Sequence, residues 1–297
     1  MEVFDVVVVI PVGPACKIGY LSDTINSIAH YITDKYKIVI ADDSQKGLGK
    51  AMQAHFDGVD VIASPKNLGK VGGLYRNLSA AYQHALQHYN FPVLLKMDDD
   101  ALAIGSNPQR QAIRFFADQP ATGMAGRHIT GQVSADHYGN LHDNYWPRKQ
   151  LLKDACSWKL IRRPAANLRL RKLFFRALRH GYEVGENIQG GVYFMSRPCL
   201  EQLNDAGLLP DLRLSKANLG EDLLFSLLVK AVGLNLADLS SPSGPVGCAW
   251  KGLPASPQTL YRDGKKLIHS IRFWKDSDEA AIRQFFKEKR GEAVPQP

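Results

Sequence analysis

The chain has 297 residues, 45% of them hydrophobic and 22% charged, which is enough to bury one large core or two tightly joined halves. Its longest apolar run, residues 6–10, is far shorter than the roughly 20 residues of a membrane helix, and residues 1–5 lack the basic region of a signal peptide. Four scattered cysteines form no Cys-x-x-Cys pair, and the net charge of +8 comes from one stretch, so we expect a cytoplasmic protein without a zinc or redox site.

The first third of the chain alternates strand-like and helix-like segments. Residues 6–10 form a continuous β-branched run, typical of a strand buried on both faces. This order of segments predicts parallel strands joined by helical crossovers, with ligands bound at the carboxyl ends of the strands. The other expected strands are residues 37–41, 59–63 and 91–97, and the expected helices are residues 22–32 and 74–88.

The second half is less regular. Residues 126–147 are polar and loop-like. A basic stretch follows, with eight lysines and arginines and no acid between Trp158 and Tyr182, while the rest of the chain is nearly neutral. Further on, we expect a strand at residues 191–195, an amphipathic helix at 219–231 and two basic helices at 261–290.

Three consecutive aspartates form the strongest chemical signal. The apolar strand that ends at residue 97 runs directly into Asp98, Asp99 and Asp100. Alternation along the strand puts Asp98 and Asp100 on one side, and such carboxylates repel one another unless a cation joins them. The pair is therefore predicted to bind Mg²⁺ or Mn²⁺, which would neutralise a leaving diphosphate. The alternative is an exposed acidic turn.

A second strand also ends in carboxylates, at Asp42 and Asp43, followed by Ser44. A carboxylate at this position can accept hydrogen bonds from a base or from ribose hydroxyls. A turn that caps the next helix is the alternative.

A glycine-rich loop at residues 67–76 leads into a predicted helix. Asn67 opens this loop, and Gly69 and Gly73 would let the backbone approach a phosphate or a base closely. Arg76 falls one turn into the helix, within reach of a nucleotide. A plain turn is the alternative.

Glu221 and Asp222 lie at the start of the helix predicted at residues 219–231. Their carboxylates are candidates for the general base that deprotonates an acceptor hydroxyl. Acids in a first helical turn also stabilise the helix dipole, so a structural role is the alternative.

Together and in this order, the segments from about residue 6 to residue 251 resemble glycosyltransferase family 2. The glycine loop and the aspartate run are most similar to the galactofuranosyltransferase and rhamnosyltransferase branch. The resemblance implies a GT-A fold, an α/β domain with a Rossmann-like, mostly parallel sheet flanked by helices. It divides one compact catalytic domain into a donor-binding half at residues 1–127, an acceptor-binding half at 128–255 and a helical tail at 256–297.

The resemblance also implies roles for individual residues. Asp98 and Asp100 would hold the metal, and Gly190 and Gly191 would line the acceptor side. Asp222, beside Glu221, would deprotonate the acceptor, which attacks the anomeric carbon opposite the departing nucleotide diphosphate and inverts it. The donor would contact Pro11, Asp42, Asp43, Asn67, Gly69, Gly73, Arg76, Asp98, Asp99 and Lys251.

The chain departs from the family pattern at two points. The family often places a metal-binding histidine where this chain has Lys251. An ammonium group has no lone pair for a metal, so we expect Lys251 to contact the diphosphate directly, and His269 to be a packed helix histidine. The glutamine–arginine–tryptophan motif of processive synthases is absent, which predicts the transfer of a single sugar.

The resemblance predicts a UDP- or dTDP-sugar donor and a glycan or lipid-linked glycan acceptor, as in cell-envelope polysaccharide synthesis, and no nucleic-acid partner. The basic stretch would contact an anionic membrane or acceptor at the cytoplasmic face, or else form a solvated helix at the rim of the active site. One alternative is a GT-A-like sugar nucleotidyltransferase, although residues 11–19 lack its glycine-rich basic signature. The other is a non-enzymatic basic adaptor for membranes or nucleic acid, which leaves the carboxylates unexplained.

Overall fold

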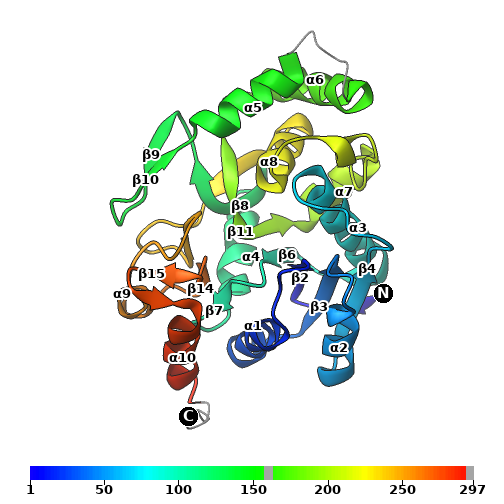
Figure 1. Ribbon diagram of the computed structural model, residues 1–297. Helices are drawn as coiled ribbons and strands as arrows, with labels where there is room; N and C mark the ends of the chain where they lie inside the picture. The colour runs from blue at the N-terminus through cyan, green and yellow to red at the C-terminus, as the bar shows by residue number, and fades with distance from the viewer. Residues whose placement is uncertain (157–162, 292–297) are drawn as a thin grey trace.

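The computed structural model describes residues 1–156 and 163–291, and a seven-stranded sheet runs through its centre (Figure 1). The strand order is β12-β8-β11-β6-β2-β3-β4. Neighbouring strands are parallel except at β11, which runs antiparallel to both β6 and β8. The strands are β2 (Val6–Val12), β3 (Tyr36–Asp42), β4 (Val59–Ala63), β6 (Val93–Met97), β8 (Thr122–Ile129), β11 (Asn187–Ser196) and β12 (Asn235–Asp238).

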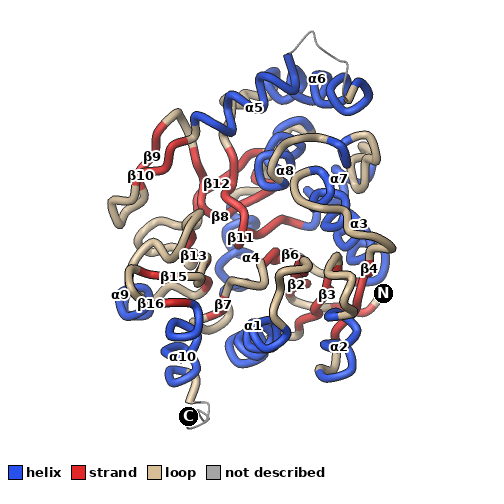
Figure 2. The backbone as a smooth tube through the Cα atoms, in the orientation of Figure 1, coloured by secondary structure: helices blue, strands red, loops and turns tan. Residues whose placement is uncertain are grey.

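Helices cover both faces of this sheet (Figure 2). On one face, Ile25 of α1 and Phe116 of α4 share a hydrophobic core with Leu95 of β6. On the other, side chains of α3, α6, α7 and α8 share a core with Leu94, the next residue of the same strand. The helices are α1 (Ile18–Tyr31), α2 (Leu48–His55), α3 (Gly72–His88), α4 (Pro108–Asp118), α5 (Tyr145–Cys156), α6 (Pro164–Arg179), α7 (Arg197–Asp205), α8 (Glu221–Ala231), α9 (Pro257–Arg262), α10 (Glu279–Lys289) and the short 3₁₀ helix η1 (Leu214–Lys216).

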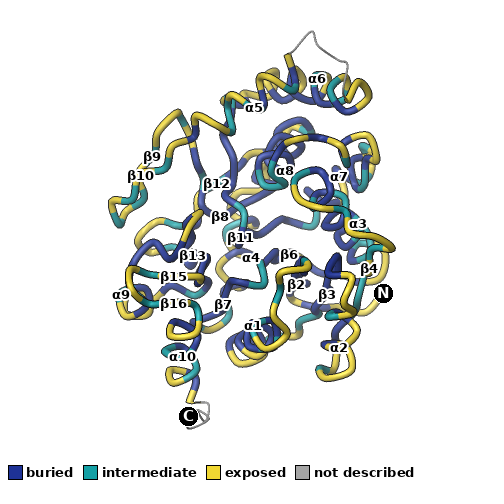
Figure 3. Tube along the Cα trace, in the orientation of Figure 1, coloured by how far each residue is buried: buried dark blue, intermediate teal, exposed yellow. Residues whose placement is uncertain are grey.

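Burial explains why the strands could be read from the sequence. Every residue of β2 is buried (Figure 3), as its unbroken apolar run predicts for a strand with helices on both sides. The predicted strands of the first third, the helices at residues 74–88 and 219–231, and a mostly parallel sheet flanked by helices are confirmed. The helix predicted at residues 22–32 is also present, but it begins earlier, at Ile18.

The C-terminal part forms a small module around a second sheet. Its three strands are β13 (Val246–Cys248), β14 (Leu267–His269) and β7 (Leu102–Ala103), in the order β13-β14-β7. Two helices were predicted at residues 261–290. This prediction is wrong for the segment between α9 and α10, which is described throughout and contains strands and no helix. Residues 267 and 268 are fully buried between the neighbouring strands, and the short strands β15 (Phe273–Trp274) and β16 (Ser277–Asp278) follow.

The prediction that residues 126–147 form a loop is also wrong. The segment contains the end of β8, a hairpin of β9 (Val133–Ala135) and β10 (Leu141–Asp143), and the start of α5. The carboxylate of Asp136 organises the hairpin turn, because it accepts hydrogen bonds from the backbone N–H groups of Tyr138 and Asn140. This interaction is local to a polar turn, and hydrophobic periodicity does not report it.

The basic stretch is only partly described, since Trp158, Lys159 and Arg162 lie outside the described residues. Its remainder includes α6, which lies on the periphery next to α5 (Figure 1). A short parallel pair, β1 (Glu2–Val3) and β5 (Tyr89–Asn90), completes the fold. Within residues 1–156 and 163–291, no helix combines the length and apolar character needed to cross a membrane.

Candidate functional site

A cavity of about 690 Å³ opens at the carboxyl ends of β2, β3 and β6. This is the edge of the sheet where ligands bind in folds of this kind. Seven of the residues predicted to form the site line the cavity, namely Pro11, Asp43, Asn67, Gly69, Asp98, Asp99 and Asp100. Six polar or charged side chains that the sequence analysis did not single out also line it: Lys17, Tyr20, Lys70, Asn77, Arg272 and Glu279.

Asp98, Asp100 and His269 form a compact cluster at the edge of the cavity. Each offers one ligand atom, and the three atoms lie within 4.8 Å of one another. His269 Nε2 is 3.6 Å from Asp98 Oδ2 and 3.3 Å from Asp100 Oδ1. Asp100 Oδ1 is buried, and within the described residues its charged neighbour is the His269 imidazole. Two carboxylates and one imidazole this close together fit a divalent cation.

The expectation that His269 packs within a helix is therefore wrong. His269 ends strand β14, which pairs with β13 and β7 and so reaches the end of β6. Gly191 makes room for its ring: the φ angle of Gly191 is +98°, and a Cβ there would lie 2.2 Å from His269 Nδ1. Gly191, which was predicted to line the acceptor side, therefore packs against the ring of His269.

Asp100 and His269 shift each other's pKa in opposite directions. Burial alone raises the pKa of Asp100, but His269, Ser270 and Arg272 outweigh burial and hold that pKa well below its usual value. Burial lowers the pKa of His269, but the Asp100 carboxylate more than compensates and holds that pKa above its usual value. A cation bound here would compete with a proton for the imidazole.

Arg272 is a cationic side chain that contacts the cluster from the cavity. Its Nε lies 2.7 Å from Asp100 Oδ2, and its side chain is 68% exposed at the cavity. Lys251, predicted to contact the diphosphate, is exposed, and its ammonium lies 4.6 Å from the centre of the Trp250 ring. It is not among the residues that line the cavity, and its contact with the donor stays a prediction.

The remaining aspartate, Asp99, lines the cavity but is not part of the cluster. Burial raises its pKa to about 6, against a hydrogen bond from Cys16 and with support from the neighbouring carboxylates. Its backbone oxygen accepts hydrogen bonds from Thr24 of α1 and Arg283 of α10. The middle residue of the run therefore also joins the end of β6 to two helices.

The two aspartates after β3 have different surroundings. Asp42 accepts hydrogen bonds from the backbone N–H groups of Ser44 and Gly49, both at 2.8 Å, so it organises the start of α2. Both carboxylate oxygens of Asp43 lie 2.9 Å from the N–H of Leu68, and Asp43 lines the cavity. Asp43 is thus the one of the two aspartates that a ligand in the cavity could contact.

The glycine loop is shaped by close packing. A Cβ on Gly73 would lie 1.8 Å from the carbonyl oxygen of Leu68, and one on Gly72 would lie 2.6 Å from that of Ser215. These contacts hold the loop over the cavity edge, where Asn67 and Gly69 are exposed. Arg76 is half-buried on α3 and does not line the cavity, so its role stays a prediction.

Glu221 and Asp222 open helix α8 beside β11. The N–H of Gly190 donates to Asp222 Oδ2 over 3.1 Å, and a Cβ on Gly190 would lie 3.0 Å from Glu221 Oε1. Burial raises the pKa of Glu221 to about 7, with Lys96 opposing that shift and Asp222 and Asp98 adding to it. The structure thus brings the predicted base motif and the predicted acceptor strand together.

Sequence analysis missed two residues near Asp222. Lys96 of β6 is fully buried between Asp98 and Glu221. His142 of β10 is half-buried; burial and the Arg127 guanidinium lower its pKa, against the pull of Asp222. A lysine inside an apolar strand was a signal available in the sequence. The position of His142 depends on the hairpin, which the sequence analysis did not predict.

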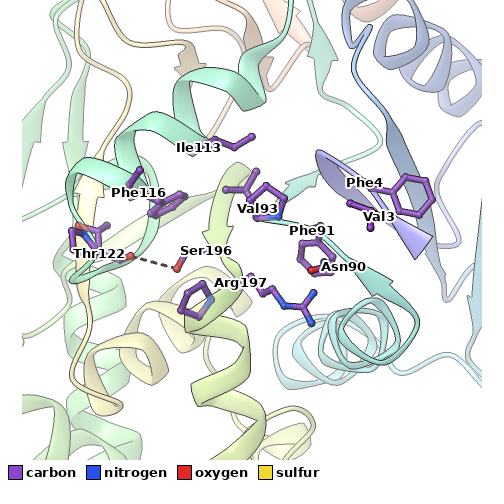
Figure 4. Close-up of a pocket in the computed structure, with 14 residues that line it drawn as sticks. Val3, Phe4, Asn90, Phe91, Val93, Ile113, Phe116, Thr122, Ser196 and Arg197 are labelled. Atoms are coloured by element: carbon purple, nitrogen blue, oxygen red, sulfur yellow. Dashed lines mark hydrogen bonds between the residues drawn. The ribbon is translucent and has the colours of Figure 1, made fainter. Parts of the chain in front are cut away.

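A second cavity, of about 510 Å³, lies at the opposite end of the strands (Figure 4). Its wall is mostly apolar and includes Phe4, Phe91 and Phe116. Among the residues that line it, Arg197 is the one ionisable side chain, and it is paired with Glu201. This cavity lacks the groups needed for acid–base chemistry or for binding a metal.

Comparison with known proteins agrees with this geometry. The model of the glycosyl transferase family 2 matches residues 7–175, which is more than half of the chain. Among solved structures, the apo structure of the bifunctional glycosyltransferase WbbM is similar over 97% of this chain, with a TM-score of 0.51 and 13% identity. This chain spans about half of that protein, since the match covers 50% of its length. A search of curated proteins finds no match.

Proposed function

This chain belongs to glycosyl transferase family 2, and we propose that it transfers one sugar from a nucleotide-diphosphate sugar to a hydroxyl group of a glycan or lipid-linked glycan. The enzyme is a glycosyltransferase with a GT-A fold. This assignment disfavours the two alternatives, a sugar nucleotidyltransferase and a non-enzymatic adaptor. The observation that carries the proposal is the cluster of Asp98, Asp100 and His269 at the edge of the 690 Å³ cavity, with Asp222 on the neighbouring helix.

The donor site is proposed at the cavity, with a UDP- or dTDP-sugar as the favoured donor. Asp43 faces the cavity with the loop of Asn67 and Gly69, on the side suited to the nucleoside. Mg²⁺ or Mn²⁺ at Asp98, Asp100 and His269 would balance the charge that develops on the leaving diphosphate. Arg272 lies beside this cluster and is suited to contact the same phosphates.

The proposed reaction inverts the anomeric carbon. Asp222 accepts the proton of the acceptor hydroxyl, and the resulting oxygen nucleophile attacks the anomeric carbon on the face opposite the diphosphate. The N–H of Gly190 orients the Asp222 carboxylate. Glu221 lies 3.4 Å from the buried ammonium of Lys96, which supports Asp222 rather than Glu221 as the proton acceptor.

The acceptor is proposed to be held near an anionic membrane, on its cytoplasmic side, through α6. This helix buries one face, including Leu170 and Phe174, against the core. Its outer face exposes Leu168, Phe175 and Leu178 together with Lys172, Arg176 and Arg179. Apolar residues ringed by basic ones suit a helix that lies in the plane of a membrane surface, where each basic residue contributes roughly 1 kcal/mol.

The test is donor hydrolysis. The protein is incubated with UDP-, dTDP- and GDP-sugars, with Mn²⁺, with Mg²⁺ or with EDTA, and release of the free sugar is followed. Slow hydrolysis of one donor that stops with EDTA and in Asp100→Asn is expected. A donor that is hydrolysed equally fast with EDTA, or in Asp100→Asn, would remove the proposed metal-assisted chemistry.

A further inference from the structure

Lys96 lies at an unusual position for a charged side chain. It is on the central strand β6, two residues before Asp98, and its side chain has no exposed surface. The neighbouring residues of the strand, Leu94 and Leu95, pack into the two hydrophobic cores. Burial of a lone ammonium group costs several kcal/mol unless partners compensate for the lost water, so the partners of Lys96 show why the residue is tolerated.

Those partners come from two different parts of the site. The ammonium lies 2.6 Å from Asp98 Oδ1 and 3.4 Å from Glu221 Oε1. The ring of Tyr193 lies 5.4 Å from the ammonium and adds a cation–π contact. Two carboxylates and an aromatic ring thus surround the ammonium group, which compensates for its burial.

The other fully buried lysine of the described chain, Lys265, shows a different pattern. Its ammonium donates to the backbone carbonyl groups of Ser241, Pro242 and Gly244, and so it ties one loop together. The ammonium of Lys96 instead forms ion pairs with two acidic side chains of the site, Asp98 and Glu221. A buried ion pair of this kind is weak evidence for a role in stability, because well-packed apolar residues often replace such pairs without loss.

We propose that Lys96 is a positioning residue that links the metal-side carboxylate of Asp98 to the base motif of α8 through Glu221. It occupies Oδ1 of Asp98 and leaves Oδ2 facing His269, at 3.6 Å. It also fixes Glu221, and with it the first turn of α8 that carries Asp222. The anomeric carbon held by the donor and the base that activates the acceptor are thereby kept at a set separation.

This inference rests on the proposed function, and a double-mutant cycle tests it. The variants are Lys96→Met, Glu221→Gln and the double variant, with Tyr82→Phe as the control. Tyr82 is buried in the same layer and hydrogen-bonds to Tyr193 over 2.8 Å, but it carries no charge. For each folded variant, the kcat of the hydrolysed UDP- or dTDP-sugar at saturating Mn²⁺ and the Kd of Mn²⁺ are measured.

We expect Lys96→Met and Glu221→Gln each to lower kcat at least tenfold, and the double variant to stay within about threefold of Lys96→Met. Residues that act as a unit give such non-additive effects. Mn²⁺ should bind Lys96→Met at least as tightly as the wild type, because a positive charge has been removed beside the carboxylates. Tyr82→Phe should keep its kcat within twofold of the wild-type value.

Two results would overturn the inference: a folded Lys96→Met with wild-type kcat, or single effects that multiply in the double variant. A weaker Mn²⁺ affinity with kcat fully restored at saturating Mn²⁺ would also overturn it, because Lys96 would then act on the metal alone. If Lys96→Met does not fold, the double variant is compared with Glu221→Gln instead. Equal kcat values support the link, and a kcat of the double variant tenfold below that of Glu221→Gln refutes it. A wild-type protein without metal-dependent hydrolysis would instead refute the proposed function.

Discussion

Replacement of His269 by alanine tests the metal site most directly. His269 supplies one of three ligand atoms that lie within 4.8 Å of one another. Changes to groups that only support a ligand cost 10- to 100-fold in metal affinity, so loss of the ligand itself should raise the Kd of Mn²⁺ at least tenfold, or about 1.4 kcal/mol. Donor hydrolysis at low Mn²⁺ should fall in parallel.

The same substitution has a second effect, on the metal-free protein. His269 and Asp100 are 7% and 5% exposed, and their charged atoms are 3.3 Å apart. Removal of one partner of a buried pair costs about 3 kcal/mol or more. Thermal unfolding without metal should therefore shift to lower temperature in His269→Ala. This loss of stability is measured separately, so that metal affinity is compared only between folded proteins.

Electron spin-echo spectroscopy of bound Mn²⁺ gives the direct readout, because a coordinated imidazole nitrogen modulates the echo. The modulation should be present in the wild type and in Lys251→Ala, and absent in His269→Ala. Lys251 is the matched control, since its ammonium cannot coordinate a metal. Nitrogen modulation that persists in His269→Ala, together with wild-type affinity, would refute the three-ligand site.

Four further predictions follow from the same structure. Asp98→Asn should remove most turnover while the far-ultraviolet circular dichroism stays unchanged; near-normal turnover would contradict a role in holding the metal. Asp222→Asn should lower kcat about 10²-fold or more with the donor Kd preserved, whereas loss of donor binding would move Asp222 to the donor site. Phe175→Asp should abolish salt-sensitive sedimentation with phosphatidylglycerol vesicles but not donor hydrolysis, and no binding by the wild type would remove the membrane contact. Burial raises the pKa of Asp211, but Arg213 and Arg169 outweigh burial and hold that pKa below its usual value. The ionised carboxylate therefore stabilises the fold above pH about 4, and this stabilisation is lost as the pH falls further. In denaturant titrations, Asp211→Asn should have a lower free energy of unfolding than the wild type at pH 6, and that free energy should change less between pH 6 and pH 3.

The parts of the fold that could be predicted are those that depend on local periodicity. The apolar run of β2 and the leucine-rich run of α8 are visible in the sequence because both elements are buried. The amphipathic character predicted for α8 is wrong, because every residue from Leu223 to Ala231 is buried. Strand alternation predicted that Asp98 and Asp100 lie on one side. Both contact His269, but β6 ends at Met97, so the turn after the strand and not alternation brings them together.

The parts that could not be predicted depend on contacts between distant segments. His269 looks like an interior residue of an apolar helix until its strand is paired with β13 and β7. Lys251 lies three residues after the end of β13, and chain order alone does not show that its side chain contacts Trp250. Asp42 and Asp43 are adjacent in the sequence, and only the fold shows that Asp42 holds backbone N–H groups while Asp43 faces the cavity.

The placement of His269 on β14 has a consequence for synthesis of the protein. Ser270, the next residue, donates a hydrogen bond to Asp100 across 170 positions of the chain. The first strands can pair while the ribosome is still making the second half, but the cation cluster stays incomplete until β14 has left the exit tunnel. A nascent chain therefore contains Asp98 and Asp100 well before it contains His269, the third member of the cluster.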